Sequence, residues 1–240
     1  MNASSSARLH ENLAAVRGRI VDACRRASRP PGDVRLVGVT KYVSPELTAA
    51  LVAAGCPDLA ESRPQALWAK AEALAGVEPP PRWHLVGHLQ SNKVRRTIGL
   101  VSLLHSLDSR RLLDVLEAEA RRLGRPCDVL VEVNIAADPG RTGLPAEEVG
   151  PLLAAAAACE HVRVRGLMGM ASVPEGSLAG GQARRQFAVL RELRDRLRAD
   201  TPATMTLDEL SMGMSGDFEE AILEGATLVR VGSALWEGVT

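Results

Sequence analysis

Apolar residues recur along the chain at two spacings, one typical of helices and one typical of strands. Between residues 7 and 27 they share one helical face, which predicts an amphipathic helix: Leu9, Leu13, Val16, Ile20 and Cys24. The Pro-Pro-Gly sequence at 30–32 is expected to end that helix. An almost continuously apolar run follows at 34–41, as expected of a parallel strand that is buried on both faces.

From this first strand onward, strand and helix patterns alternate to the end of the chain. Strands are predicted at residues 34–41, 59–61, 83–86, 100–107, 129–135, 162–168, 207–211 and 228–231. Helices are predicted after Ser44, whose hydroxyl would cap the first turn, and at residues 64–74, 90–96, 109–123, 145–159, 182–199 and 217–223.

Eight strands, each followed by a helix or the start of one, predict an α/β fold, a (β/α)8 TIM barrel with an extra N-terminal helix. A doubly wound open sheet is the alternative. No second apolar unit remains after the eighth strand, so residues 1–240 are expected to form a single domain.

Charge and composition exclude several classes of function. The formal net charge is zero, so no overall field attracts nucleic acid or an anionic membrane. No apolar run approaches the roughly 18 residues of a membrane span, and residues 1–6 lack the features of a signal peptide. The four cysteines lack metal-ligand spacing: Cys24, Cys56, Cys127 and Cys159. We expect a cytoplasmic monomer with buried, reduced thiols.

Lysine is scarce, and one lysine closes the first predicted strand. Lys41, Lys70 and Lys93 are the only lysines, whereas arginine supplies almost all the other positive charge. An arginine cannot be deprotonated in a protein, but a desolvated lysine can lose its proton and attack a carbonyl. Lys41 is therefore a candidate Schiff-base residue. The alternative is a solvated lysine in a βα loop.

Two glycine-rich turns follow the predicted seventh and eighth strands, where barrels often bind phosphate. They occupy residues 211–217 (SMGMSGD) and 230–233 (RVGS). Glycine lets backbone N–H groups approach an anion closely, and serine adds a hydroxyl donor. Ser215 or Asp217 could instead cap the next helix. Because the two turns lie on consecutive strands, we favour a phosphate site.

Arg230 and His84 are polar residues on predicted strands. Arg230 faces the barrel mouth if Val229 and Val231, which alternate with it, face the helices. An ion pair with an inward-facing Glu132 is the alternative. We expect His84 to be structural and hydrogen-bonded, since no carboxylate lies near it in the sequence to orient it as a base. The spacing of His and Cys residues does not support a zinc site.

Taken together, these segments resemble the YggS/PROSC family of pyridoxal phosphate (PLP) homeostasis proteins, which are related to the barrel of alanine racemase. The matching segments follow the family's order and are 36–41 (LVGVTK), 60–62 (AES), 83–93 (WHLVGHLQSNK), 133–135 (VNI), 166–168 (GLM), 210–215 (LSMGMS) and 229–233 (VRVGS). The chain departs from the family pattern in five places: Ser62 replaces the usual asparagine, His88 a proline, Arg141 a lysine and Ser233 a threonine, and residues 235–238 (LWEG) replace a phenylalanine–glycine ending.

The resemblance implies fold type III of PLP proteins, PLP as the cofactor, and a set of site residues. Lys41 would hold PLP as an internal aldimine, and Arg230 would face the pyridine nitrogen. Ser211, Gly232 and Ser233 would bind the phosphate, and Met212 and Gly213 would be further cofactor-binding residues. Met168 would line the ring, and Ser62 stands where relatives place an asparagine against it. An arginine at the ring nitrogen disfavours the pyridinium and so weakens the electron sink of PLP catalysis.

The resemblance therefore implies an intracellular carrier or regulator of PLP without robust catalysis, whose partners are PLP and apoenzymes that accept it. No catalytic residue is predicted. The alternative is a PLP-dependent amino-acid racemase, which needs a tyrosine from a second domain. Tyr42, the only tyrosine, would point away from Lys41 if the strand continued. A Schiff-base aldolase is a third hypothesis, but no positioned acid–base pair is evident for it.

Overall fold

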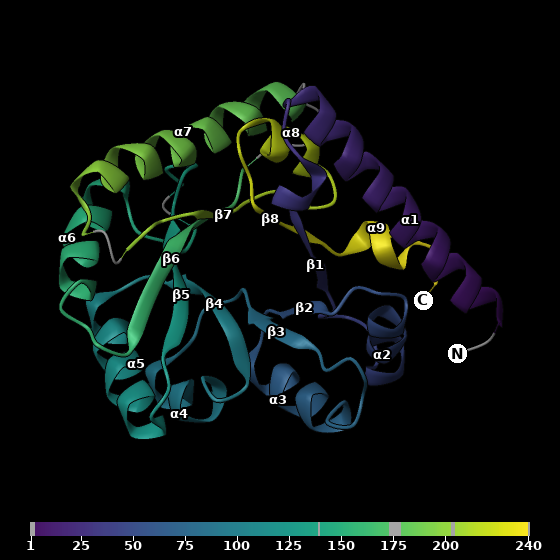
Figure 1. The fold of residues 1–240 in the computed structure, drawn as a ribbon, viewed down its shortest axis with the longest axis horizontal. Helices are drawn as coiled ribbons and strands as arrows, with labels where there is room; N and C mark the ends of the chain where they lie inside the picture. Colours follow the sequence, from purple (N-terminus) through teal and green to yellow (C-terminus); the bar gives the residue numbers. More distant parts are fainter. Residues whose placement is uncertain (1–2, 139, 173–178, 203–204, 240) are drawn as a thin grey trace.

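A computed structural model describes residues 3–138, 140–172, 179–202 and 205–239, drawn as a ribbon in Figure 1. The strands are β1 (Arg35–Val39), β2 (Asp58–Glu61), β3 (Arg82–Leu85), β4 (Val101–Leu107), β5 (Cys127–Val133), β6 (Val162–Gly169), β7 (Glu209–Ser211) and β8 (Leu228–Val231). The α-helices are α1 (Ala3–Arg26), α2 (Pro45–Ala53), α3 (Pro64–Ala73), α4 (Val94–Thr97), α5 (Arg110–Leu123), α6 (Ala146–Ala156), α7 (Ala179–Asp200), α8 (Phe218–Leu223) and α9 (Ser233–Trp236). Short 3₁₀ helices lie at η1 (Pro31–Asp33) and η2 (Ser91–Lys93).

The eight strands are parallel and close into a barrel in sequence order. Closure is made by β1 and β8, where Arg35 pairs with Leu228 and Gly38 with Val231. The predicted TIM barrel is confirmed, and the doubly wound sheet is excluded because an open sheet has no such closing pair. Closure also brings the turn after β1 beside the turn after β8.

The barrel wall separates two apolar cores. A small inner core fills the barrel and contains Val37, Ala60, Leu103, Leu130, Met168 and Leu228. A larger outer core lies between the strands and the helices, and it includes Val229 and Val231. Side chains alternate between the two faces of a strand, so Arg230 faces the barrel interior, as the sequence pattern predicts.

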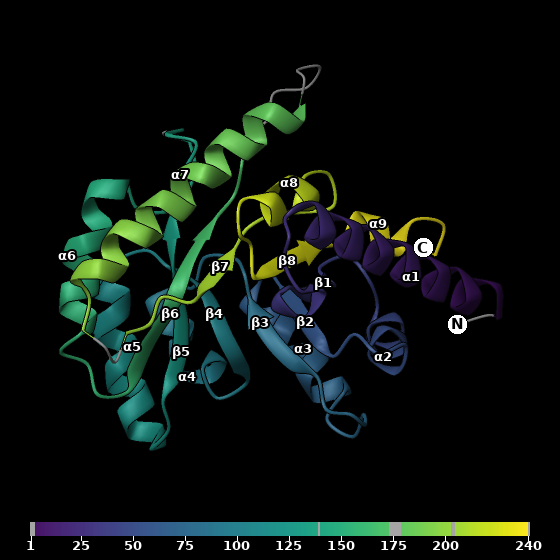
Figure 2. The ribbon, with the colours of Figure 1, turned by 45° about the horizontal axis from the view of Figure 1, so that its top comes forward.

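The extra N-terminal helix α1 packs along α8 and α9 on the outside of the barrel, and the two views of Figures 1 and 2 agree on this placement. The side-chain amide of Asn12 donates to the carbonyl oxygens of Leu235, at 3.1 Å, and Glu237, at 2.8 Å. Arg19 donates to the carboxylate of Glu219 on α8, at 2.9 Å. The first helix thereby holds the last segment of the chain against the barrel.

Two elements differ from the sequence prediction. The first strand ends at Val39 because the Thr40 carbonyl turns to accept a hydrogen bond from the Val43 N–H, at 3.1 Å. The predicted helix at 90–96 is a 3₁₀ turn followed by one turn of α-helix. The cap at Ser44 is confirmed, since its hydroxyl oxygen accepts from the Leu47 N–H.

None of the helices in the described part of the chain is long and apolar enough to cross a membrane. The four cysteines are free thiols. Cys24, Cys56 and Cys127 are buried, as predicted, whereas Cys159 at the end of α6 is partly exposed. Burial raises the pKa of Cys56 to about 11 and that of Cys127 to about 12.

Candidate functional site

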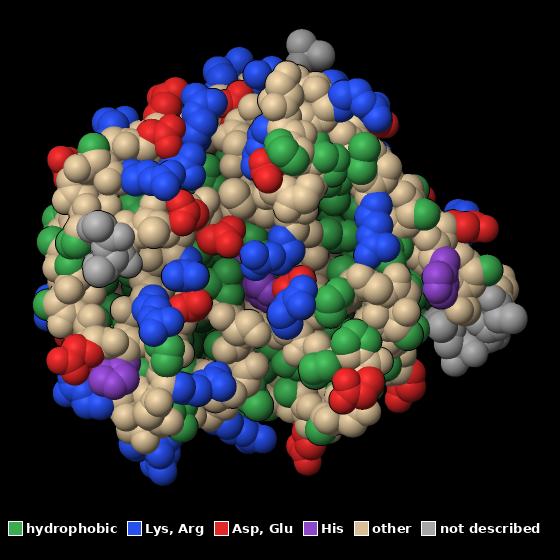
Figure 3. Space-filling view, viewed as in Figure 1, with side chains coloured by type: hydrophobic (Ala, Val, Ile, Leu, Met, Phe, Trp, Pro, Cys, Tyr) green, Lys and Arg blue, Asp and Glu red, His purple; other side chains and the backbone are tan. Residues whose placement is uncertain are grey.

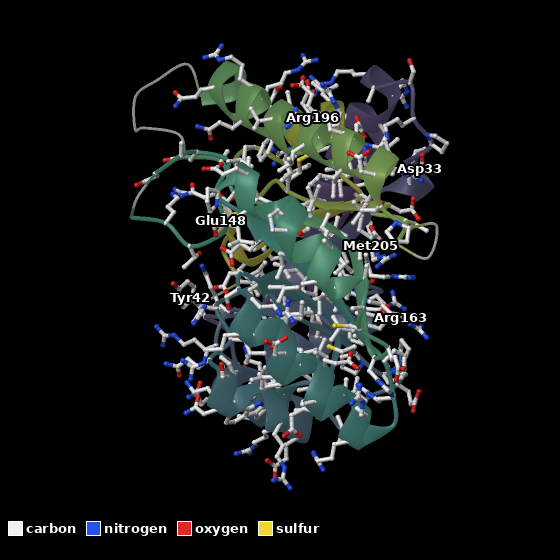
Figure 4. All side chains as sticks on the ribbon, turned by 90° about the vertical axis from the view of Figure 1, so that its left-hand side faces the viewer. Asp33, Tyr42, Glu148, Arg163, Arg196 and Met205 are labelled. Carbon is white, nitrogen blue, oxygen red and sulfur yellow. The ribbon has the colours of Figure 1, made fainter. Side chains whose placement is uncertain are left out.

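The two ends of the barrel carry different residues. Figure 4 shows Tyr42 and Glu148, which follow β1 and β5, on one side of the molecule. Asp33, Arg163 and Met205, which lie at or before the starts of strands, are on the other side. Functional sites of TIM barrels lie at the end where the strands finish, so the end that carries Tyr42 is the barrel mouth.

A cavity of about 960 Å³ opens at this mouth, between the ends of β1 and β8. It is lined by side chains from the turns after β1, β7 and β8, by Arg19 of α1 and by the last residues of the chain. Four of the predicted site residues line it: Lys41, Arg230, Gly232 and Ser233. The pairing of β1 with β8 places these four together, because their turns leave adjacent strands.

Lys41 lies in the turn directly after β1, and its side chain is exposed to the cavity. Its Nζ lies 4.9 Å from the centroid of the Tyr42 ring. Tyr42 was expected to point away from Lys41 only if the first strand continued through both residues. The strand β1 instead ends at Val39, and the chain turns. Tyr42 therefore lies beside the lysine and lines the same cavity, with 85% of its surface exposed.

Backbone N–H groups converge in the turn after β8. Gly232 and Ala234 both donate to the hydroxyl oxygen of Ser215, at 3.2 and 3.3 Å. An oxygen atom thus sits where two backbone donors meet, which is the arrangement that binds an oxygen of an anion. Ser215 and Ala234 were not among the predicted cofactor-binding residues, although both line the cavity. The donors' convergence depends on the spacing of two turns, which the sequence does not display.

Arg230 lies at the floor of the cavity and is 3% exposed. Its Nη1 donates to the Ser211 hydroxyl oxygen at 2.6 Å, and its Nη2 donates to the Gly169 carbonyl at 3.1 Å. The alternative of an ion pair with Glu132 is not observed, since Glu132 accepts from the Thr142 hydroxyl. Burial lowers the pKa of Arg230 to about 10, so this guanidinium remains charged at neutral pH.

The other predicted site residues lie around the cavity rather than in its lining. Ser62 follows β2 and is half-buried, with its carbonyl against Gly87. Met168 belongs to the inner core beneath the mouth. Ser211 is buried below Arg230, and Met212 belongs to the outer core. Gly213 has φ +91° and packs against Phe218 and Ala221, so only glycine fits there.

His84 is hydrogen-bonded inside the barrel, and the carboxylate that the nearby sequence lacks comes from the neighbouring strand β2. Its Nε2 lies 3.1 Å from Asp58 Oδ1, and its Nδ1 lies 2.9 Å from Nε2 of His105. His105 was not predicted. Its alternation with the inward-facing Leu103 is the one sequence signal that could have shown it. No group of three or more His, Cys, Asp or Glu residues in the described ranges is arranged to hold a metal ion.

Comparisons with known proteins agree with this geometry. The family model of the alanine racemase N-terminal domain matches residues 12–238. The pyridoxal phosphate homeostasis protein of Aquifex aeolicus is 38% identical over 226 residues, which cover 94% of this chain and 96% of that protein. The protein of the same name from Pseudomonas aeruginosa is 36% identical over 227 residues, covering 94% of each chain.

Solved structures show the same barrel. PipY of Synechococcus elongatus, solved with PLP bound, superposes with a TM-score of 0.81 at 33% identity and covers 95% of this chain and 99% of that chain. Alanine racemase from Corynebacterium glutamicum superposes with a TM-score of 0.70 at 16% identity, covering 96% of this chain and 60% of that chain, which shows the fold alone. The chain therefore belongs to the alanine racemase N-terminal domain family and, within it, to the pyridoxal phosphate homeostasis proteins.

Proposed function

We propose that this protein binds PLP in the mouth cavity and acts in intracellular PLP homeostasis. The observation that supports this proposal is that three kinds of functional group face one cavity. An amine (Lys41), a buried guanidinium (Arg230) and converging backbone N–H donors (Gly232 and Ala234) all face it. PLP has an aldehyde that can react with the amine, a pyridine ring that can face the guanidinium, and a phosphate that the backbone N–H groups can bind.

The donor set fits the cofactor at each position. The Ser215 oxygen, which accepts from two backbone N–H groups, stands where a phosphate oxygen would be bound. Gly232 lies against Val39, so a side chain there would crowd the end of β1. Trp236 donates from its ring nitrogen to the Val39 carbonyl, at 2.8 Å, and closes one wall of the cavity. A cavity of about 960 Å³ is in the upper range of small-molecule sites.

Lys41 is the residue that would hold PLP covalently, because it is the one lysine among the cavity residues. When bound, PLP supplies an aldehyde that condenses with an amine and a ring that withdraws electrons. Arg230 is charged and donates only, so it opposes a proton on a ring nitrogen that faces it. This supports a protein that retains PLP and does not turn over amino acids at the rates of robust PLP enzymes.

Borohydride trapping tests this proposal. Purified protein is incubated with PLP, reduced with borohydride and digested, and the modified peptide is identified by mass spectrometry. We expect a pyridoxyl phosphate group on Lys41 alone, and we expect its loss in Lys41→Arg. Lys93→Arg is the matched control, since Lys93 lies outside the cavity lining. Unchanged labelling of Lys41→Arg would overturn the assignment of Lys41, and no labelling of the parent protein would overturn PLP binding itself.

A second candidate function is a weak PLP-dependent racemase, and one observation favours it. The Tyr42 ring lies beside Lys41, so a phenol and an amine face the same cavity. Incubation with L-alanine and PLP separates the two functions. A turnover of about 1 per second or more, the low end of typical enzymes, that is lost in Tyr42→Phe would favour the racemase. We expect much slower turnover.

We further propose that apoenzymes accept PLP from this protein and that residues 1–240 act as one monomeric domain in the cytoplasm. Loaded protein is mixed with an apoenzyme whose activity requires PLP, and the recovered activity is measured against free PLP at the same concentration. Faster recovery than with free PLP supports direct transfer, whereas equal recovery with slow release indicates transfer through solution. Light scattering measures the oligomeric state.

A further inference from the structure

A chain of buried hydrogen bonds runs through the barrel interior, and we call it the interior chain. It consists of Arg230, Ser211, His105, His84 and Asp58. The successive distances are 2.6 Å from Arg230 Nη1 to Ser211 Oγ, 2.9 Å to His105 Nδ1, 2.9 Å from His105 Nε2 to His84 Nδ1, and 3.1 Å from His84 Nε2 to Asp58 Oδ1. Each of these residues is at most 3% exposed.

One direction of hydrogen bonding through the interior chain satisfies both of its ends. A guanidinium can only donate, so Ser211 Oγ accepts from Arg230. Burial lowers the pKa of His105 well below its usual value, so this ring is neutral and carries one proton. If Ser211 Oγ–H donates to His105 Nδ1, then His105 Nε2–H donates to His84 Nδ1, and His84 Nε2–H donates to the Asp58 carboxylate.

The interior chain joins two charges at opposite ends of the barrel. Arg230 makes no ion pair within 4 Å in the described part of the chain; its side chain donates to two neutral acceptors, and the carboxylates of Asp217 and Glu132 act on it from farther away. Asp58, at the start of β2, is ionised. Burial alone would raise its pKa, but hydrogen bonds from Arg82 and His84 hold the pKa below its usual value. Three side chains, Ser211, His105 and His84, thus connect the cation at the mouth to an anion at the base.

Hydrogen bonds that all point the same way polarise one another. A group that donates its proton along the interior chain becomes a better acceptor for the group before it. Ser211 Oγ, which donates to His105, is therefore a better acceptor for Arg230 than an isolated hydroxyl. The arrangement also commits the Ser211 proton to His105. A hydroxyl whose proton is already donated inward cannot also donate to a phosphate.

We infer that the hydrogen bonds of the interior chain run in this one direction, from Arg230 to Asp58, and that Ser211, His105, His84 and Asp58 are positioning residues that hold the Arg230 guanidinium at the floor of the cavity. Ser211 thereby acts through Arg230 and not as a phosphate donor. The inference deepens the proposed function, and it rests on that function only where Arg230 meets the PLP ring. The hydrogen-bond directions themselves hold with no ligand.

Asp58 gives the inference a test that leaves the cavity untouched. Its partner Arg82 lies at the start of β3, at the base of the barrel. The base faces the viewer in Figure 3, where Lys, Arg, Asp and Glu side chains surround a central hollow. Asp128 lies at the same end, at the start of β5, and pairs with Arg165 at 3.5 Å. Asp128→Asn is therefore a matched control for Asp58→Asn.

The first measurement needs no PLP. Nitrogen NMR of protein with labelled histidine reports the protonation of each ring nitrogen. We expect Nε2 of both His84 and His105 to carry a proton, and Nδ1 of both rings to accept a hydrogen bond. In Ser211→Ala, His105 Nδ1 loses its donor and the signal of that nitrogen moves, while Ser211→Thr restores it. A proton on Nδ1 of either residue would overturn the inferred direction of the interior chain.

The second measurement is PLP affinity, followed by the quenching of tryptophan fluorescence. Loss of one net hydrogen bond corresponds to a weakening of about three- to tenfold, and we expect this range for both Ser211→Ala and Asp58→Asn. Asp128→Asn is expected to bind as the parent does. Parent-like affinity of Asp58→Asn contradicts its role as the acceptor at the base of the interior chain. If the parent protein does not bind PLP, the proposed function is wrong, but NMR of the parent protein still tests the interior chain. NMR of the parent protein likewise remains the test if a variant does not fold.

Discussion

Lys70 forms a buried ion pair with Glu61 behind the turn that carries Lys41, with 2.6 Å between Lys70 Nζ and Glu61 Oε1. Both side chains are at most 9% exposed. Lys70 also donates to the Thr40 carbonyl, and the Thr40 hydroxyl donates to the same Glu61 oxygen at 2.7 Å. The residue before Lys41 is thus held at its carbonyl and at its side chain. Lys70, another of the three lysines, therefore has a structural role and needs no role in covalent chemistry.

Removing the cation of this pair is expected to cost much of the protein's stability. Lys70→Met leaves Glu61 buried without its partner, and breaking a buried pair in this way lowers the free energy of unfolding by about 3–5 kcal/mol. Urea unfolding at neutral pH measures the change. Arg110→Met, which breaks the exposed pair with Asp114, is the control and should change the same free energy by at most about 1 kcal/mol. Equal losses in the two variants would contradict the role of burial.

Glycine is required at Gly213 and not at Gly18, which gives a matched pair of variants. Gly213 has φ +91°, and a Cβ there would lie 2.6 Å from the Ala221 Cβ and 2.8 Å from the Phe218 Cα. Gly213→Ala should therefore lower the free energy of unfolding by at least about 1–3 kcal/mol. Gly18 lies within α1, and a Cβ added there would meet nothing within 4 Å, so Gly18→Ala should raise the free energy of unfolding by about 0.5–1 kcal/mol. A loss of stability in both variants would contradict this distinction.

The sequence predicts the barrel well because each strand carries its own signal. Apolar runs of parallel strands and the caps of the helices are local features, so the order of elements can be read without knowing how they pack. The residues that line the mouth cavity are also predictable where they directly follow strands, as Lys41, Gly232 and Ser233 do. Their common location follows from the closure of the barrel between β1 and β8.

The interior chain and the orientation of Tyr42 were not predictable, for two different reasons. Contact between His84, His105 and Asp58 depends on the register of three strands around a closed barrel, which no short segment encodes. Tyr42 lies beside Lys41 because β1 ends two residues earlier than its apolar run suggests. That end is set by the turn at Thr40, which the buried carboxylate of Glu61 stabilises from another strand.

Stability should fall as the solution becomes mildly acidic, because His105 resists protonation in the folded state. Its pKa is well below 6.5 through burial, whereas the unfolded chain takes up a proton as pH falls through about 6.5. The unfolded state then binds more protons, so the free energy of unfolding decreases by up to about 1.4 kcal/mol per pH unit below that value. This stability is fully present at higher pH.

Urea unfolding between about pH 7 and pH 5, the range in which a free histidine titrates, measures this slope. His105→Gln should have a shallower slope than the parent, whatever its stability at neutral pH. The control His10→Gln alters an exposed histidine and should leave the slope unchanged. A parent protein whose stability does not change over this range would show that His105 takes up a proton while folded.

Pyridoxal, which lacks the phosphate, separates the two parts of the proposed binding site. Ser233 lines the cavity directly after β8, so Ser233→Ala should weaken PLP binding by about three- to tenfold, as expected for one lost hydrogen bond. Ser215→Ala frees the Gly232 and Ala234 N–H groups for a phosphate oxygen and should not weaken PLP binding. Their affinity for pyridoxal should equal that of the parent protein. Ser211→Ala should weaken both ligands by a similar factor, because Ser211 supports Arg230 at the ring. Equilibrium dialysis of the two ligands against the three variants measures these ratios. A selective loss of PLP binding in Ser211→Ala would instead place its hydroxyl at the phosphate.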